Sequence, residues 1–212
     1  MLNVEHLNQL KQELNTSTLV AVTKYVGISE IQSLLDEGIH DFGENRVDVF
    51  LKKYHVFENQ EITWHFIGHL QSKKAKKVIH CIDYLHSLES LSLAEEIQKR
   101  RETPLDCFLE VNISGETQKY GLLVEDVISF YEKLRDYDKI HVIGLMGMAS
   151  HTDNQTQIKQ QFQRLVDLKT AINQKYHQML RLSMGMSNDY QLALSMGSDY
   201  IRIGSFLFEE DK

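Results

Sequence analysis

Short apolar runs and amphipathic segments alternate along the whole chain. Each apolar run spans four to eight residues, and a polar or glycine-containing loop separates it from a stretch with apolar residues at helical spacing. The expected strands are residues 19–24, 40–43, 64–67, 83–87, 105–112, 140–146, 179–184 and 200–204. An amphipathic helix, outlined by Val4, Leu7, Leu10 and Leu14, precedes the first of them. Strands that alternate with helices predict a parallel sheet.

Helix signals fill the gaps between these strands. Ser29 and Gln32 form an expected capping box, and Gly38 is expected to end the helix that follows. Apolar stripes mark further helices over 47–54, 93–97 (capped near Ser90), 124–134 and 158–172, with one helix through the lysines near 73–77 and a short one near 187–195. Eight such units in one domain over residues 1–212 predict a closed (β/α)₈ barrel of the TIM type with an extra N-terminal helix, rather than an open doubly wound sheet.

Composition and charge restrict the possible functions. Hydrophobic residues make up 42% and charged residues 25% of the chain, which is typical of globular proteins. The formal net charge of −7 disfavours nonspecific nucleic-acid binding, because such binding needs clustered Lys and Arg. The local basic cluster is Lys73, Lys74, Lys76 and Lys77, which we interpret as a solvated helix face rather than a phosphate or RNA patch.

Cysteines and apolar segments bear on location. Cys81 and Cys107 form no CxxC pair, so we expect neither zinc nor a disulfide framework, and the apolar run around Cys107 is typical of a core residue. Residues 1–14 lack the apolar block of a signal peptide, and no segment approaches the roughly 18 apolar residues of a membrane span. We therefore expect a cytoplasmic protein with no membrane partner. Because nothing signals a large exposed interface, we expect a monomer.

The chemistry of such a barrel lies at the carboxyl ends of its strands. The residues expected there include one lysine, several glycines and small polar groups, but no cysteine and no cluster of carboxylates. They are Lys24, Glu44, Asn45, Gly68, His69, Asn112, Met146, Gly147, Met184, Gly185, Gly204 and Ser205.

Lys24 ends the first apolar run and shares a strand face with Val20 and Val22. If that face lines the barrel, the amine lies in a partly desolvated pocket, where it is more readily neutral and able to attack an aldehyde. The alternative is a lysine whose alkyl chain packs at the strand end while its amine stays in water. The residues alone leave both open.

Arg202 lies inside the apolar run 200–204, where a guanidinium needs a partner or a ligand. In a closed barrel the eighth strand neighbours the first, so we expect Arg202 and Lys24 to face one cavity. An outward arginine paired with a helix carboxylate is the alternative. Phosphates in such barrels often bind the loops after strands seven and eight. The Ser-Met-Gly-Met-Ser stretch at 183–187 and the Gly-Ser pair at 204–205 therefore predict an anion site.

Ten histidines raise the alternative of a metal site. His65 and His69 share a face if both lie on the third strand, but no carboxylate or third histidine is evident beside them. We therefore expect no metal, and we expect His65 to pack or to form hydrogen bonds at the barrel mouth.

Seven short motifs occur in order, and together they resemble one known family. They are Ala21–Lys24, Phe42–Val47, Trp64–Lys73, Glu110–Ile113, Gly144–Met146, Leu182–Ser187 and Arg202–Gly204. The set closely resembles the pyridoxal phosphate homeostasis proteins, the YggS/PROSC family, over essentially the whole chain. The resemblance implies the barrel also found in the N-terminal domain of alanine racemases, and pyridoxal 5′-phosphate (PLP) as the cofactor.

The resemblance also implies residue roles. Lys24 matches the lysine that forms a Schiff base with PLP, and Arg202 matches the arginine beside the pyridine nitrogen. Ser183, Gly204 and Ser205 match positions around the phosphate.

Asn45 matches a residue near the cofactor. The chain departs from the family at Asp48 and Val49, where Gln-Glu is usual, and at Ser205, where many relatives have threonine. These departures put local loop contacts in doubt, and the cofactor remains expected.

Two functions fit this resemblance: a PLP-dependent amino-acid racemase of low activity, and a protein that binds and delivers PLP without turnover. An arginine at the pyridine nitrogen disfavours protonation of that nitrogen, which weakens the ring as an electron sink. Racemisation also needs a second base, which an added domain supplies in alanine racemases, whereas this chain ends at Lys212 soon after the eighth strand. We therefore expect a non-catalytic carrier that buffers PLP or delivers it to PLP-dependent apo-enzymes. A barrel that binds another phosphorylated metabolite, without a Schiff base, is the third possibility.

Overall fold

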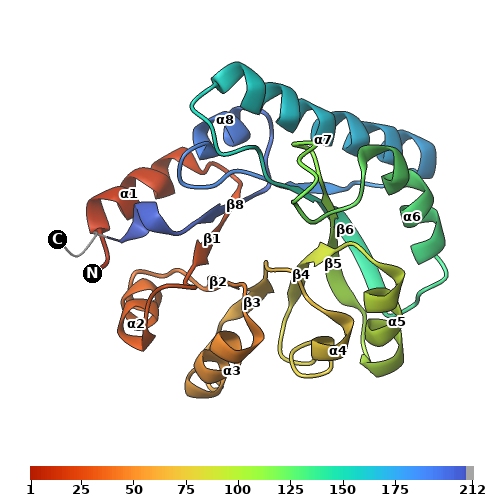
Figure 1. The fold of residues 1–212 in the computed structure, drawn as a ribbon. Coiled ribbons are helices and arrows are strands. Elements are labelled where there is room, and N and C mark those ends of the chain that lie inside the picture. Colours follow the sequence, from red (N-terminus) through yellow and green to blue (C-terminus); the bar gives the residue numbers. More distant parts are fainter. Residues whose placement is uncertain (209–212) are drawn as a thin grey trace.

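A computed structural model, which describes residues 1–208, contains a closed barrel of eight parallel strands in sequential order. Figure 1 shows the strands in the middle of the molecule and the helices around them. The strands are β1 (Thr18–Val22), β2 (Asp41–Glu44), β3 (Thr63–Phe66), β4 (Tyr84–Leu88), β5 (Leu105–Val111), β6 (Ile140–Gly147), β7 (Arg181–Ser183) and β8 (Tyr200–Ile203). β8 pairs with β1 and closes the ring, so the predicted (β/α)₈ barrel is confirmed.

The helices occupy the expected intervals. They are α1 (Val4–Glu13), α2 (Ile28–Asp36), α3 (Val47–Val56), α4 (Ser72–Ala75), α5 (Leu91–Arg100), α6 (Val127–Leu134), α7 (Gln155–Tyr176) and α8 (Tyr190–Ser195), with the short 3₁₀ helices η1 (Val124–Asp126) and η2 (Ser205–Leu207). Ser90 caps α5 as predicted, since its hydroxyl accepts from the backbone N–H of Leu93. In residues 1–208, the helices lack the combination of length and apolar content that a bilayer crossing requires.

Three local expectations are wrong. The first turn of α2 is closed by Glu30, whose carboxylate accepts from the N–H of Gly27 at 3.0 Å, and not by Ser29 with Gln32. The helix through the lysines is shorter than expected, a single turn over Ser72–Ala75 that leaves out Lys76 and Lys77, although all four lysines are exposed as predicted. β7 covers only Arg181–Ser183 instead of the expected residues 179–184, and Met179 lies exposed before the strand.

Two separate apolar clusters distinguish the strand face that lines the barrel interior from the face that packs against the helices. Val20, Phe108, Met146 and Tyr200 pack together apart from the main core. Val20 belongs to β1 and Phe108 to β5, which lie on opposite sides of the ring, so this contact runs through the barrel interior. The larger cluster lies between strands and helices and contains the buried Cys107, as predicted. Inward-facing positions are therefore identified by alternation from these four residues.

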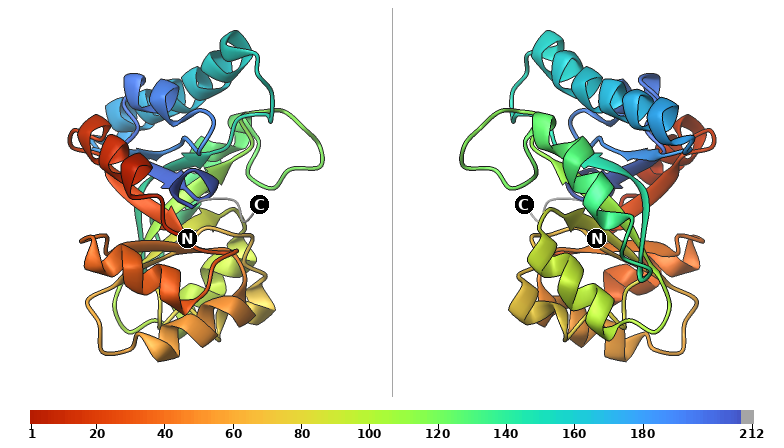
Figure 2. Two further views of the ribbon diagram at one scale, coloured as in Figure 1. Left: turned by 90° about the vertical axis from the view of Figure 1, so that its left-hand side faces the viewer. Right: turned by 90° about the vertical axis from the view of Figure 1, so that its right-hand side faces the viewer.

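A loop over residues 112–122 rises from the carboxyl end of β5. Figure 2 shows this loop, in green, projecting beyond the barrel. Asn112 organises its base, because its amide group donates to Glu116 O at 2.8 Å and its Oδ1 accepts from the N–H of Gly115 at 3.0 Å. Leu122 returns to the sheet, where its N–H donates to Glu110 O at 2.8 Å. The loop is thus fixed at both ends beside the barrel mouth.

Candidate cofactor-binding site

The carboxyl end of β1 presents Lys24 to the barrel mouth. The preceding residue, Thr23, lies on the outer face, where its Oγ1 donates to Glu44 Oε1 at 2.6 Å. β1 ends at Val22, two residues earlier than predicted, so Lys24 lies in the turn that follows the strand and its side chain is not placed by strand alternation. Its Nζ lies 4.9 Å from the ring centroid of the exposed Tyr25, and it forms no ion pair with residues of the described chain, 1–208. The half-buried amine is therefore free to meet a ligand.

A buried ion pair holds the strand end behind Lys24. Lys53 on α3 donates to Glu44 Oε1 at 2.6 Å and to the carbonyl of Thr23 at 2.7 Å. The side chains of Lys53 and Glu44 are 7% and 0% exposed. Sequence reasoning missed Lys53; the available signal is its place three residues after Phe50 on the apolar face of α3. The pair fixes the backbone from which Lys24 projects.

Arg202 lies inside the barrel and not against an outer helix. It is 4% exposed, and its register partner on β1 is the inward-facing Val20. Its Nη1 donates to Ser183 Oγ at 2.5 Å, and its Nη2 donates to the carbonyl of Gly147 at 3.2 Å. Burial lowers the pKa of Arg202 to about 10, while Asp189 and Glu110 oppose this shift. At neutral pH the guanidinium is a charged group held in place within the barrel.

Ser183 was expected among the residues around a phosphate, and the structure places it deeper. It is fully buried on β7, and its hydroxyl is engaged by Arg202 and by His86 Nδ1 at 2.9 Å. Because β7 ends at this residue, the loop that follows lies nearer the mouth. The structure therefore brings Ser183 together with Arg202 and leaves its hydroxyl engaged inside the barrel.

The loops after β7 and β8 adjoin one another at the mouth. Ser187 Oγ, from the first loop, accepts from the backbone N–H of Phe206, in the second, at 3.3 Å. Gly204 lies beside the end of β1, since a Cβ at that position would be 3.4 Å from Val22, and Ser205 is exposed. Ser187 ends the Ser-Met-Gly-Met-Ser stretch from which an anion site was predicted, although the family resemblance singled out only Ser183 within it.

Glu110 adds a second buried titratable group that sequence reasoning left out of the site. It lies two residues after the inward-facing Phe108 and is 4% exposed. Its Oε2 is buried and has no hydrogen-bond partner among residues 1–208. Burial, together with the charge of Glu89, raises the pKa of Glu110 to about 8, although Arg202 opposes this. The group is therefore mostly an uncharged carboxylic acid at neutral pH.

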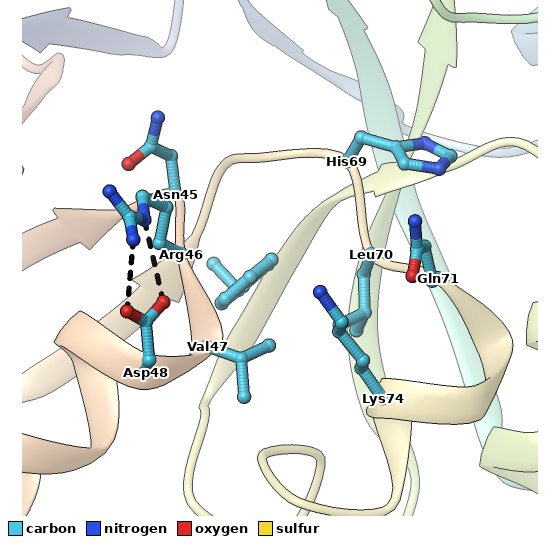
Figure 3. A pocket seen from close by; sticks show the side chains of 9 residues that line it. Asn45, Arg46, Val47, Asp48, His69, Leu70, Gln71 and Lys74 are labelled. Atoms are coloured by element: carbon cyan, nitrogen blue, oxygen red, sulfur yellow. Dashed lines mark hydrogen bonds and ion pairs between the residues drawn. The ribbon is translucent and has the colours of Figure 1, made fainter.

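Asn45 lines a separate pocket between the loops after β2 and β3, with a volume of about 230 Å³. Figure 3 shows Asn45, Arg46 and Asp48 on one side of it and His69, Gln71 and Lys74 on the other. Asp48, one of the departures from the family pattern, forms an exposed ion pair with Arg46 at 3.0 Å. Asn45 Oδ1 is buried without a partner among residues 1–208. Within residues 1–208, no hydrogen bond joins Asn45 to Arg202 or Ser183, and neither of these two lines its pocket.

His65 and His69 contact different partners and do not form a shared metal site. β3 ends at Phe66, so His69 lies in the following loop, where its Nδ1 is 2.6 Å from Glu89 Oε1. His65 lies inside the barrel, 2.9 Å from His86. Within the part of the chain that the structure describes, no cluster of three or more His, Cys, Asp or Glu side chains is placed to hold a metal ion.

Known proteins match this chain over nearly its whole length. Residues 3–211 match the family model of the alanine racemase N-terminal domain. The chain is 35% identical to the pyridoxal phosphate homeostasis protein of Aquifex aeolicus over 202 residues, which cover 93% of this chain and 89% of that protein.

Solved structures agree with this match. PipY of Synechococcus elongatus, with PLP bound, superposes with a TM-score of 0.88 at 29% identity, and the match covers 97% of this chain and 99% of that one. Alanine racemase of Corynebacterium glutamicum shares the fold, with a TM-score of 0.82 at 11% identity, and the match covers 98% of this chain but 60% of the racemase.

Proposed function

The chain belongs to the pyridoxal phosphate homeostasis protein family, and we propose that it holds PLP as a Schiff base on Lys24 and buffers or delivers the cofactor. When bound, PLP would supply an aldehyde that can form an imine with a lysine amine, with release of water. It also carries a pyridine ring and a phosphate, which need separate partners. The observation that carries the proposal is that the half-buried Lys24 follows the carboxyl end of β1, the strand that pairs with β8 and its buried Arg202.

The residues of the barrel mouth fit this group. Lys24 offers an amine with no ion-pair partner in residues 1–208, on a strand end that Lys53 and Glu44 hold in place. Arg202 offers a guanidinium that Ser183 and Gly147 orient. The adjoining loops after β7 and β8 supply small residues and backbone N–H groups, which suit a phosphate.

In this proposal Gly204, Ser205 and Ser187 hold the phosphate. Asn45 is kept as a residue near the cofactor on the family pattern, at the edge of the mouth. Ser183 acts on the cofactor through Arg202, because its hydroxyl is already engaged.

The carrier function is favoured over racemisation on electrostatic grounds. Arg202 carries a positive charge, and its two terminal nitrogens are fixed by neutral acceptors. Arg202 would disfavour protonation of a pyridine nitrogen bound beside it, because two adjacent cations repel. An unprotonated ring withdraws electrons less strongly from a bound amino acid. Arg202 therefore makes the barrel better suited to holding PLP than to using it.

Titration with PLP tests the proposal. The wild-type chain is expected to develop the absorbance band of a protonated imine, and Lys24→Ala is expected to lack it. Lys73→Ala, at an exposed lysine, is the matched control and should behave as wild type. A wild-type chain without the band would refute the proposal and would favour a barrel that binds another phosphorylated metabolite.

Exchange of amino-acid α-protons in D₂O separates the carrier from a racemase. We expect no exchange above that of free PLP for any of the common amino acids. Rapid exchange with one amino acid, abolished in Lys24→Ala, would establish a racemase-type enzyme instead.

We further propose that the protein works as a monomer in the cytoplasm and that PLP-dependent apo-enzymes receive its cofactor. Reactivation of a PLP-dependent apo-enzyme by the loaded protein tests delivery. A phosphatase that destroys free PLP distinguishes direct transfer, which it leaves intact, from transfer through solution, which it stops.

A further inference from the structure

A chain of hydrogen bonds crosses the barrel interior from Arg202 to its opposite end. Arg202 Nη1 contacts Ser183 Oγ at 2.5 Å, and Ser183 Oγ contacts His86 Nδ1 at 2.9 Å. His86 Nε2 then contacts His65 Nδ1 at 2.9 Å, and His65 Nε2 contacts Asp41 Oδ1 at 2.9 Å. The five groups come from β8, β7, β4, β3 and β2, so the chain connects five of the eight strands.

The chemistry of the two ends gives this chain a direction. A guanidinium only donates, so Ser183 Oγ accepts from Arg202 and its single hydrogen is left for His86 Nδ1. A neutral imidazole that accepts at Nδ1 carries its hydrogen at Nε2, which then donates to His65 Nδ1. By the same rule His65 donates from Nε2 to the carboxylate of Asp41. Every hydrogen of the chain has an acceptor when both histidines are neutral Nε2–H tautomers.

The opposite direction leaves a group unsatisfied. If His86 donated from Nδ1, Ser183 Oγ would accept twice and its hydrogen would lack an acceptor in this chain. His65 would then carry both hydrogens and a positive charge beside Asp41. Burial lowers the pKa of His86 well below its ordinary value of 6.5, and His65 and Arg202 lower it further, in agreement with a neutral ring.

Aromatic neighbours fix the planes of both imidazoles. His86 stacks on Phe108, with ring centroids 4.4 Å apart, and His65 stacks on Tyr84 at 4.6 Å with an interplanar angle of 7°. His65, His86 and Ser183 are fully buried, while the side chain of Asp41 is 30% exposed. The series of hydrogen bonds from Arg202 to Asp41 therefore has little freedom to rearrange.

We propose that His86, His65 and Asp41 are positioning residues, which act through Ser183 to fix the hydrogen bonds and the orientation of Arg202. Rotation of the Ser183 hydroxyl would point its hydrogen at Arg202 Nη1, in place of the lone pair that accepts the hydrogen bond from that nitrogen. His86 prevents this by accepting that hydrogen, and His65 and Asp41 determine that His86 presents Nδ1 as the acceptor. Because hydrogen bonds behind a ligand-binding side chain restrict its orientation, these three residues hold Arg202 in place before the ligand arrives. The inference rests on the proposed function only where it concerns PLP.

The first test needs no cofactor. In the ligand-free protein with ¹⁵N-labelled histidine, NMR correlations of ring nitrogens and carbon-bound protons distinguish the tautomers. We expect His65 and His86 both to be neutral Nε2–H tautomers at pH 7. An Nδ1–H tautomer at His86, or a charged His65, would overturn the proposed direction.

The second test measures PLP affinity in matched variants. His86→Phe keeps a ring stacked on Phe108 but removes both hydrogen bonds, and Ser183→Ala removes the hydroxyl. Each is expected to weaken PLP binding by about tenfold, as loss of one hydrogen bond commonly does. His141→Phe makes the same change at an exposed histidine outside the chain and should match wild type.

The outcomes separate the two proposals. If the wild type binds PLP and both variants bind it equally well, the positioning role is wrong. If the wild type forms no imine, the proposed function fails, and the tautomers of the ligand-free protein still decide the hydrogen-bond chain. If His86→Phe does not fold, the PLP affinity of Ser183→Ala and the histidine tautomers of the wild type still decide the proposal.

Discussion

Replacing Lys53 with methionine removes one partner of the buried ion pair behind β1. Methionine keeps most of the alkyl volume on the apolar face of α3, so the main loss is the ammonium. Lys53 Nζ lies 2.6 Å from Glu44 Oε1, and the side chain of Glu44 is 0% exposed. Glu44 Oε2 already has no hydrogen-bond partner among residues 1–208. The substitution therefore leaves a carboxylate buried with little compensation.

The expected loss in the free energy of unfolding is large for a single substitution. Breaking a buried ion pair on one side commonly destabilises a protein by about 3–5 kcal/mol. In a domain of this size a loss of that order lowers the melting temperature by roughly 10 °C. Urea denaturation followed by circular dichroism measures the free energy of unfolding, and a thermal melt gives the second value. PLP retention should fall as well, because Lys53 also holds the carbonyl of Thr23 next to Lys24.

Two variants make this prediction sharp. Arg46→Met removes the cation from an exposed pair, Arg46 with Asp48, whose side chains are 66% and 65% exposed, and we expect no measurable change in stability. Adding Glu44→Gln to Lys53→Met removes the uncompensated charge and should recover part of the loss. If Lys53→Met unfolds at the same urea concentration as Arg46→Met, the ion pair does not stabilise β1 as argued.

Three further predictions concern other parts of the barrel. Burial raises the pKa of Glu110 from 4.5 to about 8, so the folded state keeps a proton that the unfolded state releases above pH 4.5. Wild type should therefore lose stability relative to Glu110→Gln between pH 5 and pH 8, by roughly 4 kcal/mol in urea denaturation, and an unchanged difference would contradict this. Gly121→Ala should destabilise the chain in the same assay, by about 1–3 kcal/mol, because its φ is +111° and a Cβ would lie 2.8 Å from the Asn112 nitrogen. Gly115→Ala, at φ +75° with open space around it, should lose less. Burial raises the pKa of the Cys81 and Cys107 thiols, so a thiol reagent at pH 7 should react slowly with the folded protein and rapidly in urea.

Periodicity predicted the order of strands and helices, because each apolar run is long enough to reveal its own type. Alternation from Val20 was expected to place Lys24 on the inner face of β1, but the strand ends at Val22 and Lys24 lies in the turn after it. Boundaries were less accurate: Ser29 with Gln32 and Gly27 with Glu30 both fit a helix start, and only the backbone geometry distinguishes them. Local spacing therefore predicts that an element exists better than it predicts where it begins.

The interior contacts were not predictable from spacing, because they join strands distant in sequence. His65 and His86 are 21 residues apart, and His86 and Ser183 are 97 residues apart, so their contact depends on the register of strands around the ring. The residues around Ser183 predict its strand, but they do not predict that its hydroxyl meets Arg202 and His86 inside the barrel. The family motifs predict which residues share a site, and the fold shows that Arg202 and Ser183 are in contact.

Reductive trapping tests the central claim most directly. Incubation with PLP, reduction with borohydride and mass spectrometry of the peptides identifies the lysine that carries the cofactor. We predict one modified lysine, Lys24, with no modification of the exposed Lys73 and Lys74 under the same conditions. Modification of another lysine while Lys24 stays unmodified, or equal labelling of the exposed lysines, would contradict the account.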